Sequence, residues 1–276
     1  MMNTRSLGLP FRIGTTSYIV EDDLLANARF LAPSVEDMQL VLFDLPDGAS
    51  NLPSPVEVAA LAAFGAASGF SYTVHLLDDL RLADDNGRTP SLPLRRAHQL
   101  LDLTQSLEPW AWVGHLDGRT VRTADAEDPA LLTWRDATVK ALRLTTAGLQ
   151  APHRLAIENL EGYPAEFVTP VVTRAGVGRC VDVGHLWLDG IDPLPALAAA
   201  GARMRVVHIH GVNERDHASL AYAPPDALDA VIRTLLEMKF GGVVTLEVFG
   251  LEDFQTSRQA LMGSVARVQN KERSRS

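Results

Sequence analysis

The sequence has a single cysteine, no long apolar run and no excess of basic residues. Cys180 stands alone, so an internal disulfide is impossible and nothing points to an oxidising compartment. No apolar run approaches the ~18 residues of a membrane-spanning helix. No apolar signal core follows Met1 to Arg5. These absences predict a soluble, cytoplasmic protein with no membrane partner.

The charge balance makes nucleic acid an unlikely partner. The net charge is −9, whereas proteins that grip many phosphates usually show a basic face. The only basic cluster is the tail at 271–276, which we expect to fray. Oligomeric state has no signature in the sequence.

Eight short apolar runs alternate with helical patterns. We expect strands at 11–17, 38–44, 71–77, 111–116, 154–160, 179–183, 205–210 and 243–249. We expect helices at 22–32, in the alanine-rich stretch that ends near 69, and at 94–107, 129–147, 194–200, 225–240 and 253–269.

This alternation over roughly 250 residues is typical of a single α/β domain, the (β/α)8 TIM barrel. Continuously apolar strands fit a sheet buried on both faces. We expect one domain over 1–276 with an ordered core at about 10–270. An open doubly wound sheet would need a glycine-rich phosphate turn after an early strand, but Thr15-Thr16-Ser17-Tyr18 follows the first one.

The stretch from Arg179 to His185 suggests how a site forms at the end of a strand. Asp182 and His185 are three residues apart, which on a flat strand places them on opposite faces. They converge only if the strand ends between them, and we expect Gly184 to end it by letting the backbone turn. A carboxylate and an imidazole at a strand mouth form a metal-site pattern.

The same pattern recurs along the chain, at the strand ends where TIM barrels carry their active sites. The residues concerned are His75, His115, Glu158, Asp182, His185, His208, His210 and Glu247, with Asp216 and His217 in the loop after the seventh strand. Singly, each has an ordinary structural explanation, and His210 could merely support His208. Together, so many imidazoles and carboxylates would be costly to bury without a partner. We therefore expect two or three divalent ions, with Zn, Mn or Fe all chemically suitable.

These residues carry a resemblance to the xylose isomerase-like barrels, which include endonuclease IV and the ketose epimerases. The resemblance implies that Glu158, Asp182, His208 and Glu247 are metal ligands. Its endonuclease IV branch adds ligands matched by His75, His115, His185 and His217. Asp216 directly precedes His217, whereas the branch places this aspartate two residues before the histidine.

The N-terminal segments 11–18, 23–27, 41–44 and 51–54 resemble the cobamide-remodelling phosphodiesterases, the CbiR branch. This resemblance implies a corrinoid phosphodiester substrate of the vitamin B12 type. Hydrolysis would remove the lower ligand of the cobamide, for remodelling or salvage.

We expect Glu158 to bridge two ions. His75 and His115 would complete the first site, and the second would take Asp182, His208 and Glu247. His185 and His217, with Asp216, would hold a third ion or grip the phosphate. A cation lowers the pKa of bound water, so no side-chain nucleophile is needed. The expected catalytic residues are Glu158, Glu247 and His185, and the candidates for holding substrate are His210, Tyr18, Trp187 and Arg215.

Three other functions remain open. In a ketose epimerase, one metal orients a diol while Glu158 and Glu247 exchange a proton, and His75 and His115 have no role as ligands. An endonuclease IV-like nuclease would use the same site on DNA. A non-catalytic binding barrel would have no need of a complete ligand set.

Overall fold

The computed structural model describes residues 8–274, apart from 46, 79 and 85–87. In this part of the chain, eight parallel strands close into a barrel in the order β1 to β8. The strands are β1 (Arg12–Thr16), β2 (Asp37–Val41), β3 (Ser71–His75), β4 (Trp112–Gly114), β5 (Leu155–Glu158), β6 (Gly178–Asp182), β7 (Met204–Ile209) and β8 (Val243–Leu246). The predicted TIM barrel is thus confirmed.

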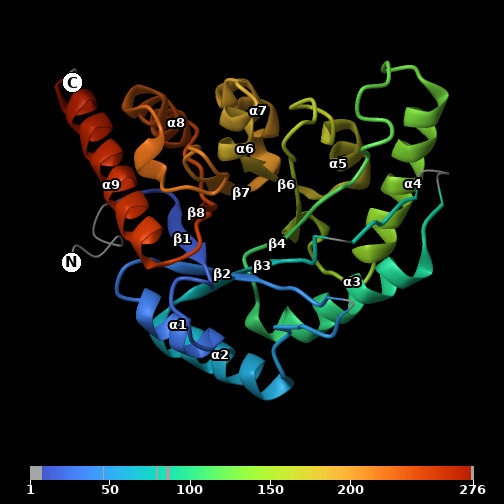
Figure 1. Cartoon of the computed structure of the whole chain (residues 1–276), viewed down its shortest axis with the longest axis horizontal. Coiled ribbons are helices and arrows are strands. Elements are labelled where there is room, and N and C mark those ends of the chain that lie inside the picture. The colour runs from blue at the N-terminus through green and yellow to red at the C-terminus, as the bar shows by residue number, and fades with distance from the viewer. Residues whose placement is uncertain (1–7, 46, 79, 85–87, 275–276) are drawn as a thin grey trace.

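The helices form a ring around the strands (Figure 1). They are α1 (Leu24–Leu31), α2 (Pro55–Ser68), α3 (Ser91–Thr104), α4 (Pro129–Thr145), α5 (Thr169–Ala175), α6 (Val183–Leu188), α7 (Pro193–Ala200), α8 (Pro225–Glu237) and α9 (Leu251–Arg273). Among the described residues, no helix is both long and apolar enough to cross a bilayer.

Helix boundaries follow local sequence signals. Asp23 caps α1 by accepting a hydrogen bond from the Ala26 amide. Helix α2 begins with a capping box between Ser54 and Glu57 and ends at Gly69, which has the left-handed conformation. The polar loop after β2 therefore has a defined start and end, and it brings Asn51 back to the barrel rim.

The structure corrects several predicted boundaries. Most strands end earlier than expected, so His115, His210 and Glu247 lie just beyond β4, β7 and β8. Helix α9 continues through part of the tail that we expected to fray, and the Lys271 ammonium lies 3.8 Å from a carboxylate oxygen of Asp229. Two short helices, α5 and α6, were not predicted because they are too short for a clear apolar period.

The barrel is filled from its N-terminal end. A cluster of small apolar side chains occupies the interior, and Trp110 packs against it. The Trp110 indole nitrogen donates to the backbone oxygen of Arg205, on β7, at 3.0 Å. Because this side chain reaches from the start of β4 to β7, it covers the floor of the barrel. The polar residues expected to form the site lie at the other end.

Candidate metal centre

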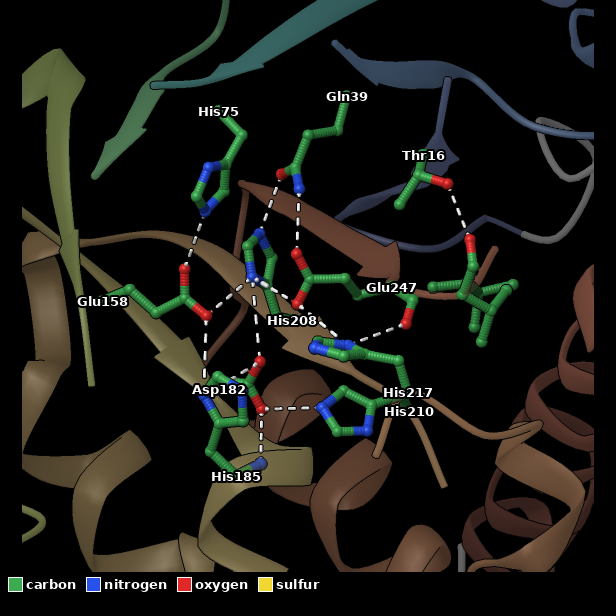
Figure 2. Close-up of polar contacts among 12 residues, drawn as sticks. Thr16, Gln39, His75, Glu158, Asp182, His185, His208, His210, His217 and Glu247 are labelled. Atoms are coloured by element: carbon green, nitrogen blue, oxygen red, sulfur yellow. Dashed lines mark hydrogen bonds and ion pairs between the residues drawn. The ribbon is translucent and has the colours of Figure 1, made fainter. Parts of the chain in front are cut away.

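The predicted histidines and carboxylates converge at the C-terminal end of the barrel. Figure 2 shows side chains from β3, β5, β6, β7 and β8 pointing toward one another. They surround a cavity of about 300 Å³, whose lining includes His75, His115, Glu158, His185, His217 and Glu247. Among the described residues, four groups of side chains offer possible ligand atoms that lie within 4.8 Å of one another inside each group. One of them, Glu158 with Cys180 and His208, shares two members with another group, so we treat three clusters.

The first group, cluster 1, consists of His75, Asp78 and His115. The Nε2 atoms of both histidines face the same oxygen of Glu158, Oε2, at 3.3 and 3.2 Å. One Asp78 oxygen lies 3.5 Å from His75 Nδ1 and 3.7 Å from His115 Nδ1. His75 and His115 thus lie together next to Glu158, as the predicted first ion site requires, whereas Asp78 lies on the Nδ1 side of both rings.

Cluster 2 consists of Glu158, Asp182, His208 and Glu247, all buried. His208 Nδ1 lies 3.0 Å from Glu158 Oε1, 2.9 Å from Glu247 Oε2 and 3.8 Å from Asp182 Oδ2. Asp182 Oδ2 and Glu247 Oε2 are buried without a hydrogen-bond partner. Such orphaned oxygens around one imidazole nitrogen are what a divalent cation would satisfy, so these residues fit a metal ion.

Cluster 3 consists of His185, His210, Asp216 and His217. Asp216 Oδ2 lies 3.7 Å from His185 Nε2 and 3.5 Å from His217 Nε2. His210 Nε2 is buried without a hydrogen-bond partner. His210, predicted as a substrate contact, therefore lies within a possible ligand group, and Asp216 and His217 reach the site despite their departure from the expected spacing.

Backbone carbonyl groups fix the orientation of four of these imidazoles. Nδ1 of His75, His185, His210 and His217 lies 2.8–3.3 Å from the backbone oxygens of Leu76, Asn159, Gly211 and Glu247, respectively. A carbonyl only accepts, so each Nδ1 carries the proton and each Nε2 is left to bind. This arrangement is typical of histidines that ligate metals.

Gln39, on β2, is a site residue that the sequence analysis missed. Its side-chain oxygen accepts from His208 Nε2 at 2.8 Å, and its amide donates to Glu247 Oε1 at 3.2 Å. Gln39 thereby leaves His208 Nδ1 as the nitrogen that faces the carboxylates. In the sequence, the signal was a glutamine inside the apolar run at 38–43. The structure shows that this glutamine is fully buried.

The role assigned to Gly184 was wrong. Strand β6 ends at Asp182, which caps α6 by accepting from the His185 amide at 2.7 Å. Gly184 lies inside this helix and has no positive φ. Its Cβ, if present, would lie 2.2 Å from the His210 ring. The glycine therefore makes room for an imidazole of cluster 3, and the helix turn is what brings Asp182 and His185 together.

The pKa values of the site residues are shifted by burial and by the opposite charges of their neighbours. Burial lowers the pKa of His75, but Glu158 and Asp78 raise it to about 9. Burial also opposes the shift at His185, where Asp182 and Glu158 raise the pKa to about 10. Burial raises the pKa of Glu158, yet His208, His115 and His75 hold it well below its usual range. The carboxylates thus favour positive charge at this end of the barrel.

The predicted substrate contacts lie at different places on the rim. The Tyr18 hydroxyl accepts from the Asn51 amide at 2.8 Å, and its ring meets Phe249, a cavity residue that we did not predict. Trp187 packs partly buried against the apolar core, and Arg215 pairs with Asp253. Tyr18, Trp187 and Arg215 are all absent from the described lining of the cavity, so their part in binding stays a prediction.

Solved structures with similar folds include proteins named as sugar epimerases and an endonuclease IV. A D-tagatose 3-epimerase-like protein matches with a TM-score of 0.74 and 17% identity, over 95% of this chain and 99% of the other. An L-ribulose 3-epimerase gives 0.68 and 15%, over 96% and 98%. Endonuclease IV from Thermus thermophilus gives 0.68 and 22%, over 93% and 99%. At these identities the likeness shows the fold alone.

Sequence comparison defines the family more directly. No curated protein sequence matches the chain. A family profile, however, matches residues 34–265, which is most of the chain and includes every residue of the three clusters. The chain belongs to the xylose isomerase-like TIM barrel family.

Proposed function

We propose that this protein is a metal-dependent phosphodiesterase. The observation that carries the proposal is the position of His75 and His115, whose Nε2 atoms both face the Glu158 oxygen that His208 does not use. Glu158 can therefore bridge clusters 1 and 2, and a two-cation site of this kind suits the displacement of a phosphodiester. A site for one cation needs only cluster 2.

The side chains divide the work as follows. Glu158 would be shared by two cations, with Asp182, His208 and Glu247 holding one of them and His75 and His115 holding the other. His185 and His217 face Asp216 at the cavity wall, where they would hold a third cation or the phosphate itself. Bound divalent cations would activate water and stabilise the charge that develops on the phosphate oxygens.

A second candidate is a sugar epimerase. Two observations favour it: several similar solved structures are named as epimerases, and Glu158 and Glu247 both contact His208 Nδ1, so they flank one cation position. In that reaction one carboxylate removes a proton and the other returns it. Clusters 1 and 3 would then have no role in the chemistry.

For the substrate, we propose the nucleotide loop of a cobamide, on the resemblance of the N-terminal segments. Their residues shape the rim of the site. The Asn27 side chain accepts from Ile19 and Val20 and donates to Val20, Asp22 and Asp23, which fixes the turn after β1. Asn51 donates to Tyr18 and to Val41. Since these contacts are structural, the substrate class rests on the resemblance and needs a direct test.

The test supplies purified protein with Mn, Fe(II) or Zn and offers it a cobamide, bis(p-nitrophenyl) phosphate, abasic DNA and a panel of ketoses. We expect hydrolysis of the phosphodiesters and release of the lower ligand from the cobamide. His75→Ala and His115→Ala should each reduce hydrolysis by about 100-fold, since loss of even an outer partner of a metal ligand costs 10–100-fold. The exposed His153 provides a control, and His153→Ala should be neutral.

The same variants separate the two candidates. Ketose epimerisation that survives in His75→Ala and His115→Ala would overturn the phosphodiesterase proposal and establish the epimerase. Hydrolysis of bis(p-nitrophenyl) phosphate without cleavage of the cobamide would keep the reaction class and refute the substrate.

A further inference from the structure

The other end of the barrel gathers cations around the Trp110 floor. Arg12 begins β1, Arg205 lies near the start of β7, and Arg154 directly precedes β5. The guanidinium carbons of Arg12 and Arg205 lie 4.6 and 4.1 Å from the centroid of the Trp110 ring. That of Arg154 lies 5.2 Å from the Trp112 ring. Three guanidinium groups are therefore held together at the N-terminal ends of the strands.

These cations have no counter-ion among the described residues. No carboxylate lies within ion-pair distance of Arg12, Arg154 or Arg205 in that part of the chain. Their partners are rings and backbone oxygens: Arg205 donates to the Trp110 oxygen at 3.2 Å, and Arg154 donates to that of Pro109. The Arg205 Nε is buried without a hydrogen-bond partner. The chain has a net charge of −9, so this group of three cations is opposite in sign to the charge of the whole protein.

The carboxylates of Asp37 and Glu36 are already engaged, whereas the exposed Glu108 only partly offsets the effect of burial on the pKa of Arg154. Asp37, the carboxylate that Arg12 influences, accepts a hydrogen bond from the Ser71 hydroxyl at 2.6 Å. Glu36 accepts from the Ile13 amide at 3.1 Å. Burial lowers the pKa of Arg205, and the charges of Arg154 and Arg12 lower it further. The three cations thus repel one another, and an anion would relieve that repulsion.

A cavity of about 560 Å³ opens beside this group, which is within the range of small-molecule sites. Arg205 and Lys239 supply its positive charge, and Trp110, Met204, Met238 and Phe240 supply apolar walls. Lys239 is exposed and has a φ of +51°, a conformation that side chains other than glycine rarely adopt. No carboxylate among the described lining residues competes for these cations.

We propose that this cavity binds a phosphate monoester with a ring-sized apolar body. The fork of the Arg205 guanidinium suits a tetrahedral oxyanion, Lys239 adds a second charge, and the exposed Met238, with the edges of Trp110 and Phe240, forms an apolar wall for the ring. The site lies at the barrel end opposite the metal centre, so it is separate from the proposed catalytic reaction and does not depend on it.

The test uses phenyl phosphate and the four tryptophans of the chain. In ¹⁵N-labelled protein, each tryptophan contributes one indole N–H resonance, and Trp110→Phe identifies that of Trp110. We expect phenyl phosphate to shift the Trp110 resonance saturably while the Trp187 resonance stays in place. Inorganic phosphate should act at higher concentration and phenol should have no effect. Inorganic phosphate binding as tightly as phenyl phosphate would refute the apolar part of the proposal.

Two variants of different kinds test the charge. Arg205→Met should raise the Kd for phenyl phosphate by about 10-fold or more, as expected when a charged hydrogen-bonding group is lost. Lys239→Gly should also weaken binding, and it should fold well because glycine suits the positive φ. Arg203→Met, an exposed residue outside the cavity lining, is the control. The proposal fails if the Trp110 shift is absent, is matched by NaCl at equal ionic strength, or is unchanged in both variants.

Discussion

At the scale of single residues, the site depends on how the two oxygens of Glu158 are divided. Oε2 faces His75 and His115, whereas Oε1 faces His208. A carboxylate in this position can join two cations and offset part of their charge. An amide of the same shape would replace one of these oxygens by a hydrogen-bond donor and would carry no charge, so it would lose this ability.

We therefore expect Glu158→Gln to lose metal from clusters 1 and 2 together. Metal content by mass spectrometry should fall, and phosphodiester hydrolysis should drop by about 100-fold or more, given that even outer-shell losses reach this size. Glu166→Gln, in the loop after the same strand, is the matched control. Full metal content with full activity in Glu158→Gln would disprove the bridging role.

Gly184 offers a test confined to cluster 3. A methyl group at this position would lie 2.2 Å from the His210 imidazole, so Gly184→Ala must displace that ring. We expect the variant to bind one metal equivalent fewer than the wild type while clusters 1 and 2 stay occupied. Gly148→Ala is the control because a Cβ there meets nothing within 4 Å. Unchanged metal stoichiometry in Gly184→Ala would exclude His210 as a ligand.

At the scale of elements, strand β2 joins the two ends of the barrel through polar side chains on one face. Asp37 and Gln39 are two residues apart, and both are fully buried. Gln39 supports His208 and Glu247 at the metal centre. Asp37 lies toward the floor, and burial raises its pKa to about 6 although the Ser71 hydroxyl donates to it.

The shift at Asp37 gives a stability prediction with a definite sign. The pKa is higher in the folded than in the unfolded chain, so folding is favoured at low pH and loses stability as pH rises from about 4 to about 6. Asp37→Asn removes this loss. Relative to wild type, its free energy of unfolding should gain about 2 kcal/mol between pH 4 and pH 7, measured by urea denaturation. A pH-independent difference would contradict the shifted pKa.

Gln39 yields a prediction about how β2 supports the metal. Gln39→Leu leaves the His208 Nε2 proton and Glu247 Oε1 without their buried partner. We expect the affinity for metal to fall by about 10- to 100-fold, the usual cost of losing an outer partner. Competition with a fluorescent chelator measures this. The control is Asn270→Leu, which removes the amide of an exposed residue on α9. Equal affinities for metal in the two variants would refute the role of Gln39.

At the scale of the whole molecule, the barrel and most of the site were predictable from sequence for the same reason. Apolar runs at regular spacing imply the strands, and in a barrel parallel strands must all end at one mouth, so residues such as His75 and Glu247 converge. Gln39 was not predicted because a lone buried amide has no characteristic spacing. Helix α6 was not predicted because six residues are too few to show a helical period. The contact of Gly184 with His210 was not predicted because it joins parts of the chain that no local pattern connects.

Closure of the sheet also sets an order of events. Strand β1 pairs with β8, Arg12 with Val243 and Thr15 with Leu246, so the first strand lacks one neighbour until the last strand is made. Glu247 is the final member of cluster 2 and directly follows β8. During synthesis, a growing chain therefore has an open sheet edge and an incomplete cation site over most of its length. The pairing of β8 with β1 closes the sheet, and Glu247 completes the cation site at the same time. Cation uptake would therefore report that the barrel has closed.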